Sequence, residues 1–318
     1  IVFSLFFFLL LLVLTSYDIF YNYRALMYKP MLPLGSCEFT LTVKPQTSAR
    51  TFVKQLWTLK LVRSRHILLA IIRWRGLSNR LQAGVYLVRP GETAIDLLNQ
   101  VANGDVLFEP FRVLEGSSLS LLKQQLLKAP YLALSPHDFD GIAGQHPSEE
   151  GLFLADTYYY KAGSQASSLL KQMNQNLLTY LAVAWQNRNP ALPYKNSYEL
   201  LIAASIIEKE ASLPTERKII SGIIVNRLTL NMPLQMDPTV LYALKVAKST
   251  PEHLQERESV SLRHQDLSIN SPYNTYRFRG LPPTPIAMVG KQSIDAAANP
   301  DKTDYLYFYA KGDGTHQF

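Results

Sequence analysis

The chain opens with an almost continuous apolar run over residues 1–14, broken only by Ser4. This run is shorter than the ~20 residues that span a bilayer, but apolar and aromatic positions continue to residue 23, with Asp18 at the interface. We therefore predict a transmembrane anchor over residues 1–23 and a juxtamembrane linker over residues 24–36. No small-x-small cleavage site follows the run, which argues against a cleaved signal peptide. Because the first residue is Ile rather than Met, we expect further residues before it.

A strand-turn-helix pattern then occurs twice. Residues 43–56 align with residues 88–101, forty-five positions later. Each copy has the end of a strand, a Pro turn, a Ser or Thr at the helix N-cap and a helix. A fainter third copy runs from Val113 through Ser118 to Leu126. The few copies and their uneven spacing predict a compact α/β module rather than a solenoid.

The segment between the two clear copies adds a further helix over residues 64–75, so residues 37–89 have the order strand, helix, helix, strand. We predict an α+β fold. It comprises the transmembrane helix, a small α/β module over residues 37–110 and a larger mixed α/β domain over residues 111–318.

The carboxyl end of the chain predicts a β-hairpin. Apolar runs at residues 304–310 and 315–318 flank a Lys-Gly-Asp-Gly turn signal. The chain stops inside the second run, so we expect it to continue beyond Phe318.

In the larger domain, the apolar run at residues 200–207 leads directly into Glu208 and, two positions later, Glu210. On a helix Glu208 shares its face with small residues such as Ala204 and Ser205, whereas Glu210 points in nearly the opposite direction. A buried Glu without a partner has its neutral form favoured, and a protonated carboxyl near neutral pH can act as a general acid. The alternative is a pair of solvated carboxylates on a helix surface.

A series of motifs distinguishes these interpretations. They are Glu208-Lys209-Glu210-Ala211, Glu216-Arg217, Asn226-Arg227-Leu228, Leu234-Gln235-Met236-Asp237-Pro238-Thr239-Val240, Tyr273-Asn274-Thr275-Tyr276, Gly280-Leu281-Pro282-Pro283 and Thr303-Asp304-Tyr305-Leu306-Tyr307-Phe308. In order and spacing they make the chain similar to the MltG/YceG family of membrane-anchored endolytic murein transglycosylases, and the likeness covers nearly the whole chain. The resemblance places the family's catalytic glutamate on Glu208.

The reaction that the resemblance implies needs one carboxyl, whereas an ordinary glycosidase needs two carboxylates flanking the bond. Glu208 would protonate the oxygen between N-acetylmuramic acid and N-acetylglucosamine. As a carboxylate it would then accept the proton of the muramic acid 6-hydroxyl, which closes a 1,6-anhydro ring without water. An ordinary hydrolase would require a second carboxylate, for which Asp237 is the nearby candidate.

The same motifs supply the predicted substrate-binding residues. Amides could hold sugar hydroxyl or N-acetyl groups, and tyrosine rings could face pyranose rings. Each of these side chains has a structural role as its alternative, and Asp237 before Pro238 also has the pattern of a helix N-cap. Arg227 has Glu208, Glu210 and Glu216 as possible ion-pair partners. The predicted substrate-binding residues are Asn226, Gln235, Asp237, Tyr273, Asn274 and Thr275, with Tyr276 as a further candidate.

Three positions depart from the family pattern. Met236 replaces a small hydroxyl residue, Asn231 replaces a common Gly, and Thr284 stands where Gly is expected. None of these changes removes a group that the reaction needs.

The charge of the chain is concentrated in the small module. The net charge is +7, yet residues 39–91 carry ten Lys or Arg and no acidic residue. Such a face would attract anionic lipid headgroups or the carboxylates of peptide stems. The chain has no zinc-finger spacing, Gly-rich RNA motif or basic heptad helix, so we predict no nucleic-acid binding. The order of elements in the module is that of LysM carbohydrate-binding modules, and the family resemblance implies a LysM-like part.

The remaining residue types predict no metal site and no cofactor. Cys37 is the only cysteine, which excludes a disulfide within the chain, and the six histidines have no paired spacing. The chain also lacks a Gly-x-Ser-x-Gly motif, a P-loop and a dinucleotide fingerprint.

The resemblance implies a single-pass protein of the bacterial inner membrane, with an extracytoplasmic catalytic domain that acts on nascent glycan strands. Peptidoglycan synthases are possible partners. Arg24 and Lys29 lie after the anchor and by the positive-inside rule would favour the opposite orientation, so the orientation rests on the resemblance. A membrane-tethered peptidoglycan-binding protein without catalysis is the alternative function.

Overall fold

The computed structural model describes residues 2–247, 262–312 and 315–318. The chain forms two units. The first comprises residues 1–109 with 160–163, and the second comprises residues 110–159 with 164–318.

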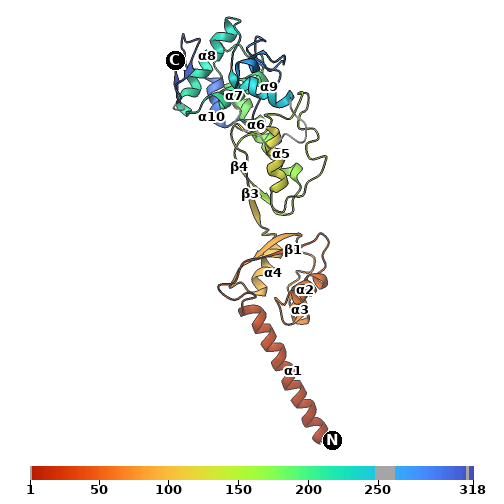
Figure 1. Ribbon diagram of the computed structural model, residues 1–318. Coiled ribbons are helices and arrows are strands. Elements are labelled where there is room, and N and C mark those ends of the chain that lie inside the picture. The colour runs from red at the N-terminus through yellow and green to blue at the C-terminus, as the bar shows by residue number, and fades with distance from the viewer. Residues whose placement is uncertain (1, 248–261, 313–314) are drawn as a thin grey trace. The chain divides into compact units, whose positions relative to one another are not determined.

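The first unit begins with α1 (Val2–Tyr28), drawn in Figure 1 as one continuous helix. Residues 6–28 of α1 are long and apolar enough to cross a membrane, and the apolar window that meets this criterion is unburied. The helix does not end with the predicted anchor at residue 23. Its last turns pack against α3 and α4, and Leu26 is buried in the core of the unit. The first part of the predicted linker is therefore helical because it contributes to this core.

The rest of the first unit has the predicted order strand, helix, helix, strand, followed by one more helix. Its elements are β1 (Phe39–Val43), α2 (Ala49–Thr58), α3 (Arg65–Trp74), β2 (Gly84–Val88) and α4 (Ala94–Asn103). The two strands pair antiparallel, with Phe39 opposite Val88 and Val43 opposite Gly84. The alternation of apolar residues with Thr in β1 buries one side of that strand.

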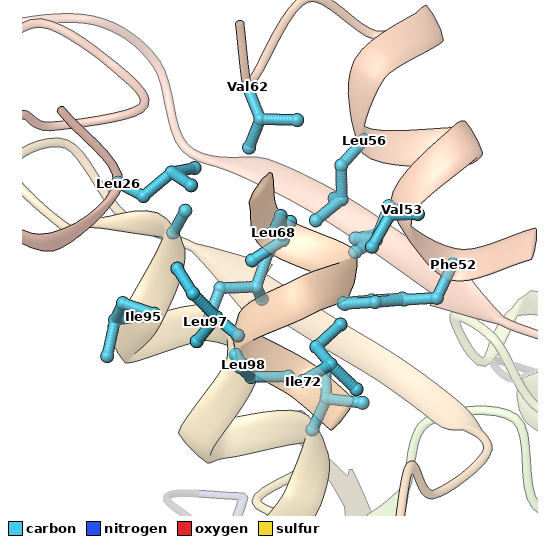
Figure 2. Close-up of a cluster of buried hydrophobic side chains, with 14 of the residues drawn as sticks. Leu26, Phe52, Val53, Leu56, Val62, Leu68, Ile72, Ile95, Leu97 and Leu98 are labelled. Carbon is cyan, nitrogen blue, oxygen red and sulfur yellow. The ribbon is translucent and has the colours of Figure 1, made fainter. Parts of the chain in front are cut away.

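The helix starts predicted from the repeat are confirmed. Ser48 accepts a hydrogen bond from the Thr51 amide at the start of α2. Thr93 and Asp96 form a reciprocal capping box at the start of α4. The helices and the two strands enclose one hydrophobic core, and Figure 2 shows part of it. Labelled there are Leu26 from α1, Phe52, Val53 and Leu56 from α2, Val62, Leu68 and Ile72 around α3, and Ile95, Leu97 and Leu98 from α4.

The second unit is mainly helical. Its elements are β3 (Phe108–Arg112), α5 (Leu119–Lys128), β4 (Thr157–Lys161), α6 (Ala166–Gln186), α7 (Ser197–Glu210), η1 (Pro214–Glu216), α8 (Arg217–Thr229), α9 (Asp237–Ala247), η3 (His264–Ser268), α10 (Lys291–Ala298), β5 (Tyr309–Ala310) and β6 (His316–Gln317). The boundary between the units falls within β3 and β4. The mixed helix and strand content agrees with the predicted α+β class.

The carboxyl-terminal hairpin is confirmed in its strands. Tyr309 pairs with Gln317 and Ala310 with His316, antiparallel. Residues 313 and 314 of the predicted turn lie outside the described residues. The hairpin is joined to the start of α8, because the backbone amide and ring Nδ1 of His316 contact the two carboxylate oxygens of Glu216 at 2.9 and 2.8 Å.

Candidate active site

Helix α7 is the central element of the candidate site. It is capped by Asn196, whose side chain accepts a hydrogen bond from the Glu199 amide. Residues 200–207 are all buried, since α6, α8, α9 and α10 pack around the helix. A helix that is apolar on every side belongs in a core. The two glutamates therefore lie at the carboxyl end of a rigid, enclosed helix.

Glu208 is an ion-paired carboxylate with very little access to solvent. Its side chain is 2% exposed, and its Oε1 accepts a hydrogen bond from Arg217 Nη2 at 3.0 Å. Its Oε2 accepts one from the Gly290 amide at 2.8 Å. Arg217 is also held by Gln292 and lies 3.7 Å from Glu115. The Glu208 carboxyl is therefore buried with two partners, an arginine side chain and a backbone amide.

Gly290 has a local reason to be glycine. It is the N-cap of α10, and its amide points at Glu208. A Cβ at this position would lie 2.0 Å from Oε1 of Glu115. A side chain at this position would therefore displace the half-exposed Glu115 carboxylate.

Glu210 has the opposite surroundings. It is half-buried, and no hydrogen bond or ion pair is found for its carboxyl within the described part of the chain. Burial, with a further contribution from the negative charge of Asp237, raises the pKa of Glu210 to about 7. A carboxyl with this pKa is partly protonated at neutral pH, which is the property that a general acid needs.

Two polar side chains, Asp237 and Tyr276, lie close enough to Glu210 for their charges to interact. Asp237 is the first residue of α9, and its Oδ1 accepts a hydrogen bond from the hydroxyl of Tyr276. Burial raises the pKa of Tyr276, and hydrogen bonding to Asp237 and the charges of Asp237 and Glu210 add to the effect. Gln235, exposed and in a left-handed backbone conformation (φ 52°), accepts a hydrogen bond from Arg227 at 3.0 Å.

Arg227 supports this region through carbonyl groups. Its guanidinium donates to the carbonyl oxygens of Pro233 and Leu234 at 3.0 Å and to that of Leu306 at 2.6 Å. It also lies 4.7 Å from the centre of the Tyr307 ring. Of the three glutamates proposed as its partners from the sequence, none forms an ion pair with Arg227 in the described residues.

Three other predicted substrate-binding side chains are engaged within the protein. The Asn226 amide donates to the carbonyl oxygens of Thr303 and Tyr305 at 2.7 and 3.0 Å. The amide of Asn274, which is fully buried, donates to the carbonyls of residues 267 and 269. Thr275 is buried against Thr239, with 2.8 Å between their hydroxyl oxygens. These contacts fit the structural alternative that the sequence left open for each residue.

Tyr273 belongs to a second polar group with a buried glutamate. Its hydroxyl lies 2.9 Å from that of Thr284, and its ring packs on Tyr242 at 4.8 Å between centroids. Tyr242 in turn donates to Glu150 Oε2 at 3.3 Å. Burial raises the pKa of Glu150 to about 7, despite the hydrogen bonds from the Leu119 amide and Tyr242. The sequence analysis did not single out Glu150, because it lies in a loop without helical or strand periodicity.

Arg217 is a partner of Glu208 that the sequence does not predict. Arg217 stands in the Glu216-Arg217 motif, nine positions after Glu208, and the spacing alone does not say that the chain turns back after α7.

Two surface depressions lie away from the two glutamates. One is lined by Ile219 with residues 301–305, and the other by residues in the range 87–108, and neither contains Glu208 or Glu210. Within the described residues, no cluster of His, Cys, Asp and Glu could hold a metal ion.

Comparisons with known proteins relate the chain to one family. The YceG-like family matches residues 41–318. A curated Bacillus subtilis (strain 168) protein named endolytic murein transglycosylase is 40% identical over 175 residues, which cover 54% of this chain and 44% of that protein. A Streptococcus pneumoniae serotype 2 protein of the same name is 33% identical over 165 residues, covering 51% of this chain and 28% of that protein. The matched stretches thus span less than half of these relatives.

A solved structure agrees over a larger part of the chain. The crystal structure of a yceG-like protein from Listeria monocytogenes aligns with 89% of this chain and 96% of its own, with a TM-score of 0.52 and 25% sequence identity. The alignment therefore includes most of both units.

Proposed function

Because the chain belongs to the YceG-like family, we propose that it is an endolytic peptidoglycan lytic transglycosylase, anchored by α1. Its substrate is the glycosidic bond between N-acetylmuramic acid and N-acetylglucosamine in nascent glycan strands. The product carries a 1,6-anhydro end. The name of the curated relatives and the presence of a carboxyl with a pKa near 7 support this reaction.

Glu210 is the acid and then the base in this proposal, in place of Glu208. The observation that carries the assignment is the contrast between the two carboxyls. Glu208 is held by a guanidinium and a backbone amide, and its side chain is 2% exposed. Glu210 is half-buried with a pKa raised to about 7.

In the first step the Glu210 carboxyl protonates the glycosidic oxygen as the bond to the muramic acid C1 breaks. The carboxylate then accepts the proton of the 6-hydroxyl, whose oxygen attacks C1 and closes the anhydro ring. No water enters the products. The proton that left Glu210 in the first step returns to it in the second, so one residue completes the cycle.

Burial raises the proton affinity of Glu210, and the charge of Asp237 raises it further. The negative charge of Asp237 favours the protonated form of Glu210 before the bond breaks. The same charge stabilises the positive character that develops on the sugar ring in the transition state. Gln235 is exposed two positions before Asp237 and supplies an amide for a sugar substituent in this proposal.

A second function is supported by the position of Asp237. Because its charge acts on Glu210, these two residues supply the pair of carboxyls that a hydrolase requires. Hydrolysis would add one water to each cleaved bond and leave a reducing end. The mass of the new ends distinguishes the two reactions.

The small module is a LysM-like glycan-binding part in this proposal, and the second unit is the catalytic domain. The order of strands and helices in the module, β1-α2-α3-β2, supports this assignment. We place the protein in the bacterial inner membrane as a single-pass protein with an extracytoplasmic site, since its substrate lies there. Peptidoglycan synthases that make the nascent strands are the proposed partners.

The test compares the full chain in detergent with its Glu210→Gln and Glu208→Gln variants on uncrosslinked glycan strands. The full chain is needed because Leu26 of α1 is part of the core. Mass spectrometry should find ends lighter by one water than hydrolysis products. Glu210→Gln should abolish them, because the amide has no proton to donate at neutral pH.

Glu208→Gln serves as the matched control, since it changes charge in the same way two residues away. It should retain turnover in the folded fraction but lose stability, because Arg217 would be left buried with a weakened partner. Loss of activity in Glu208→Gln with an intact fold, and retained activity in Glu210→Gln, would reverse the assignment. Uncut strands with every variant and with the unmodified chain would favour the non-catalytic binding protein.

A further inference from the structure

We propose that the connection between α2 and α3, centred on Trp57, Arg63 and Arg65, docks on the anionic headgroups of the membrane that α1 enters. This inference rests on the anchoring role of α1 in the proposed function. It adds a lipid-binding surface that fixes the small module against the bilayer. The contacts that support this surface all lie within the first unit.

The last turns of α1 belong to the module and not to the bilayer. Asn22 and Leu26 are buried at 9% and 4% exposure, and Leu26 is part of the module's core. Asn22 also donates to the Asp18 carboxylate at 3.0 Å. A helix face covered by protein cannot also face lipid tails. With Asp18 at the interface, we place the headgroup level near residues 18–23, where the helix reaches the module.

Arg63 lies at that level because it contacts α1 directly. Its Nη1 donates to the Tyr21 hydroxyl at 3.0 Å, and its guanidinium lies 5.4 Å from the centre of the Tyr21 ring. Tyr21 stacks with Tyr17 one turn earlier, at 6.5 Å between centroids. Tyrosines at this position along a membrane helix favour the interface, where the ring is in apolar surroundings and the hydroxyl is hydrated.

The neighbouring residues of the connection have the chemistry of a membrane-interface surface. The Arg65 guanidinium lies 5.3 Å from the centre of the Trp57 ring. Trp57 and Leu59 are 47% and 42% exposed, although both are large and apolar. Lys60 follows at the turn after α2, with φ 58°. At a membrane interface, exposed Trp and Leu side chains can reach the lipid tails, while neighbouring cationic side chains contact the anionic headgroups.

An anionic membrane is the occupant that these contacts favour over a soluble anion. The surface is continuous with α1 through Arg63, so it meets the membrane whenever α1 spans it. Each basic residue near an anionic leaflet shifts the docked equilibrium roughly fivefold, so removing two should shift it roughly 25-fold. Leu59 is exposed beside Trp57, and lipid tails offer this aliphatic side chain an apolar contact that a soluble acidic glycan or peptide lacks.

The test uses the full chain in vesicles, with Trp74→Phe and Trp185→Phe so that Trp57 is the only tryptophan. The vesicles contain phosphatidylcholine alone or mixed with phosphatidylglycerol, with acyl chains brominated near the headgroup. Quenching of Trp57 fluorescence by bromine reports docking. We expect quenching with phosphatidylglycerol, weaker quenching in high salt, and its loss in the Arg63→Ala/Arg65→Ala variant.

The matched control is Arg50→Ala/Arg80→Ala, which removes the same charge from exposed positions of the module. Arg50 lies about 12 Å along α2 from the connection, and Arg80 follows the far end of α3. This variant should keep its quenching. Equal loss of quenching in both variants would overturn a specific surface in favour of general charge attraction.

Carbonate extraction of the same vesicles separates this proposal from the anchor. If the chain resists extraction and Trp57 is never quenched, the docking surface is wrong and the anchor stands. If the chain is extracted, both are wrong. If soluble glycan with stem peptides shifts Trp57 fluorescence on phosphatidylcholine vesicles while phosphatidylglycerol does not, the surface binds the wall instead of lipid.

Discussion

Two glutamates that are two positions apart receive opposite electrostatic surroundings from their neighbours. Glu208 has one guanidinium and one amide donor, both of which bind the charged form. Glu210 has burial and the charge of Asp237, both of which favour the neutral form. Environments that separate the proton affinities of nearby carboxyls are a common way to assign one of them to acid catalysis. The proposed division of roles rests on the partners of each glutamate and not on the residue type.

The first prediction concerns the pH profile of turnover. Because Glu210 must carry a proton when the glycosidic bond breaks and its pKa is about 7, activity should fall as pH rises through about 7. Asp237→Asn removes the charge that favours the protonated form, so the descending limb should move to lower pH. Rates of anhydro-end formation across pH test both statements. A descending limb that stays in place in Asp237→Asn would contradict the role of Asp237.

At the scale of elements, Glu150 stabilises the amino-terminal end of a helix to which it does not belong. Ser118 is the N-cap residue of α5 but makes no capping hydrogen bond with its side chain. The Glu150 carboxylate instead accepts from the amide of Leu119, the first residue of α5, at 2.8 Å. It also binds Tyr242 of α9. The carboxylate thus connects two helices while its burial opposes its own ionisation.

The second prediction concerns Glu150 and stability. Its folded pKa of about 7 exceeds the ordinary value of 4.5, so the folded state binds more protons between these values and loses stability as pH rises through them. The loss is at most about 3 kcal/mol. Glu150→Gln should unfold with less pH dependence than the unmodified chain, with Glu210 still contributing. Denaturant unfolding at pH 5 and pH 8 measures the difference, and Glu149→Gln is the control for lost charge.

At the scale of the whole molecule, the amino-terminal helix is both a candidate membrane span and a part of the first unit. Leu26 packs in the same cluster as Leu68 and Leu97 (Figure 2). The module therefore cannot be separated from α1 without opening its core. A continuous helix with no flexible joint transmits the position of the membrane to the module.

The third prediction tests this coupling. Leu26→Ala should destabilise the first unit by about 2–5 kcal/mol, because it removes a buried side chain and leaves a cavity. Hydrogen exchange of the full chain in detergent should become faster in α3 and α4 and stay unchanged in α7. Leu12→Ala, at a 49% exposed position of α1, is the matched control and should change neither. Unchanged exchange in Leu26→Ala would show that α1 does not support the module.

The sequence by itself determined the elements and the family. Apolar periodicity, Ser and Thr caps and the Pro turns set the helices and strands of the first unit, because these signals act within a few residues. The motif order indicated the family and the pair of glutamates. Helical spacing also placed the two carboxyls on different faces of α7, correctly as a statement about local geometry.

Only the tertiary structure decided what those faces meet. Arg217 and Gly290 bind Glu208 from positions nine and 82 residues further along the chain. Asp237 acts on Glu210 from 27 residues further along. No local pattern predicts such pairings. The same holds for Asn226, Asn274 and Thr275, whose polar groups are used by distant backbone and side-chain partners. Proton affinity and burial depend on which groups fold against a side chain. The different surroundings of Glu208 and Glu210 are therefore a property of the packed molecule.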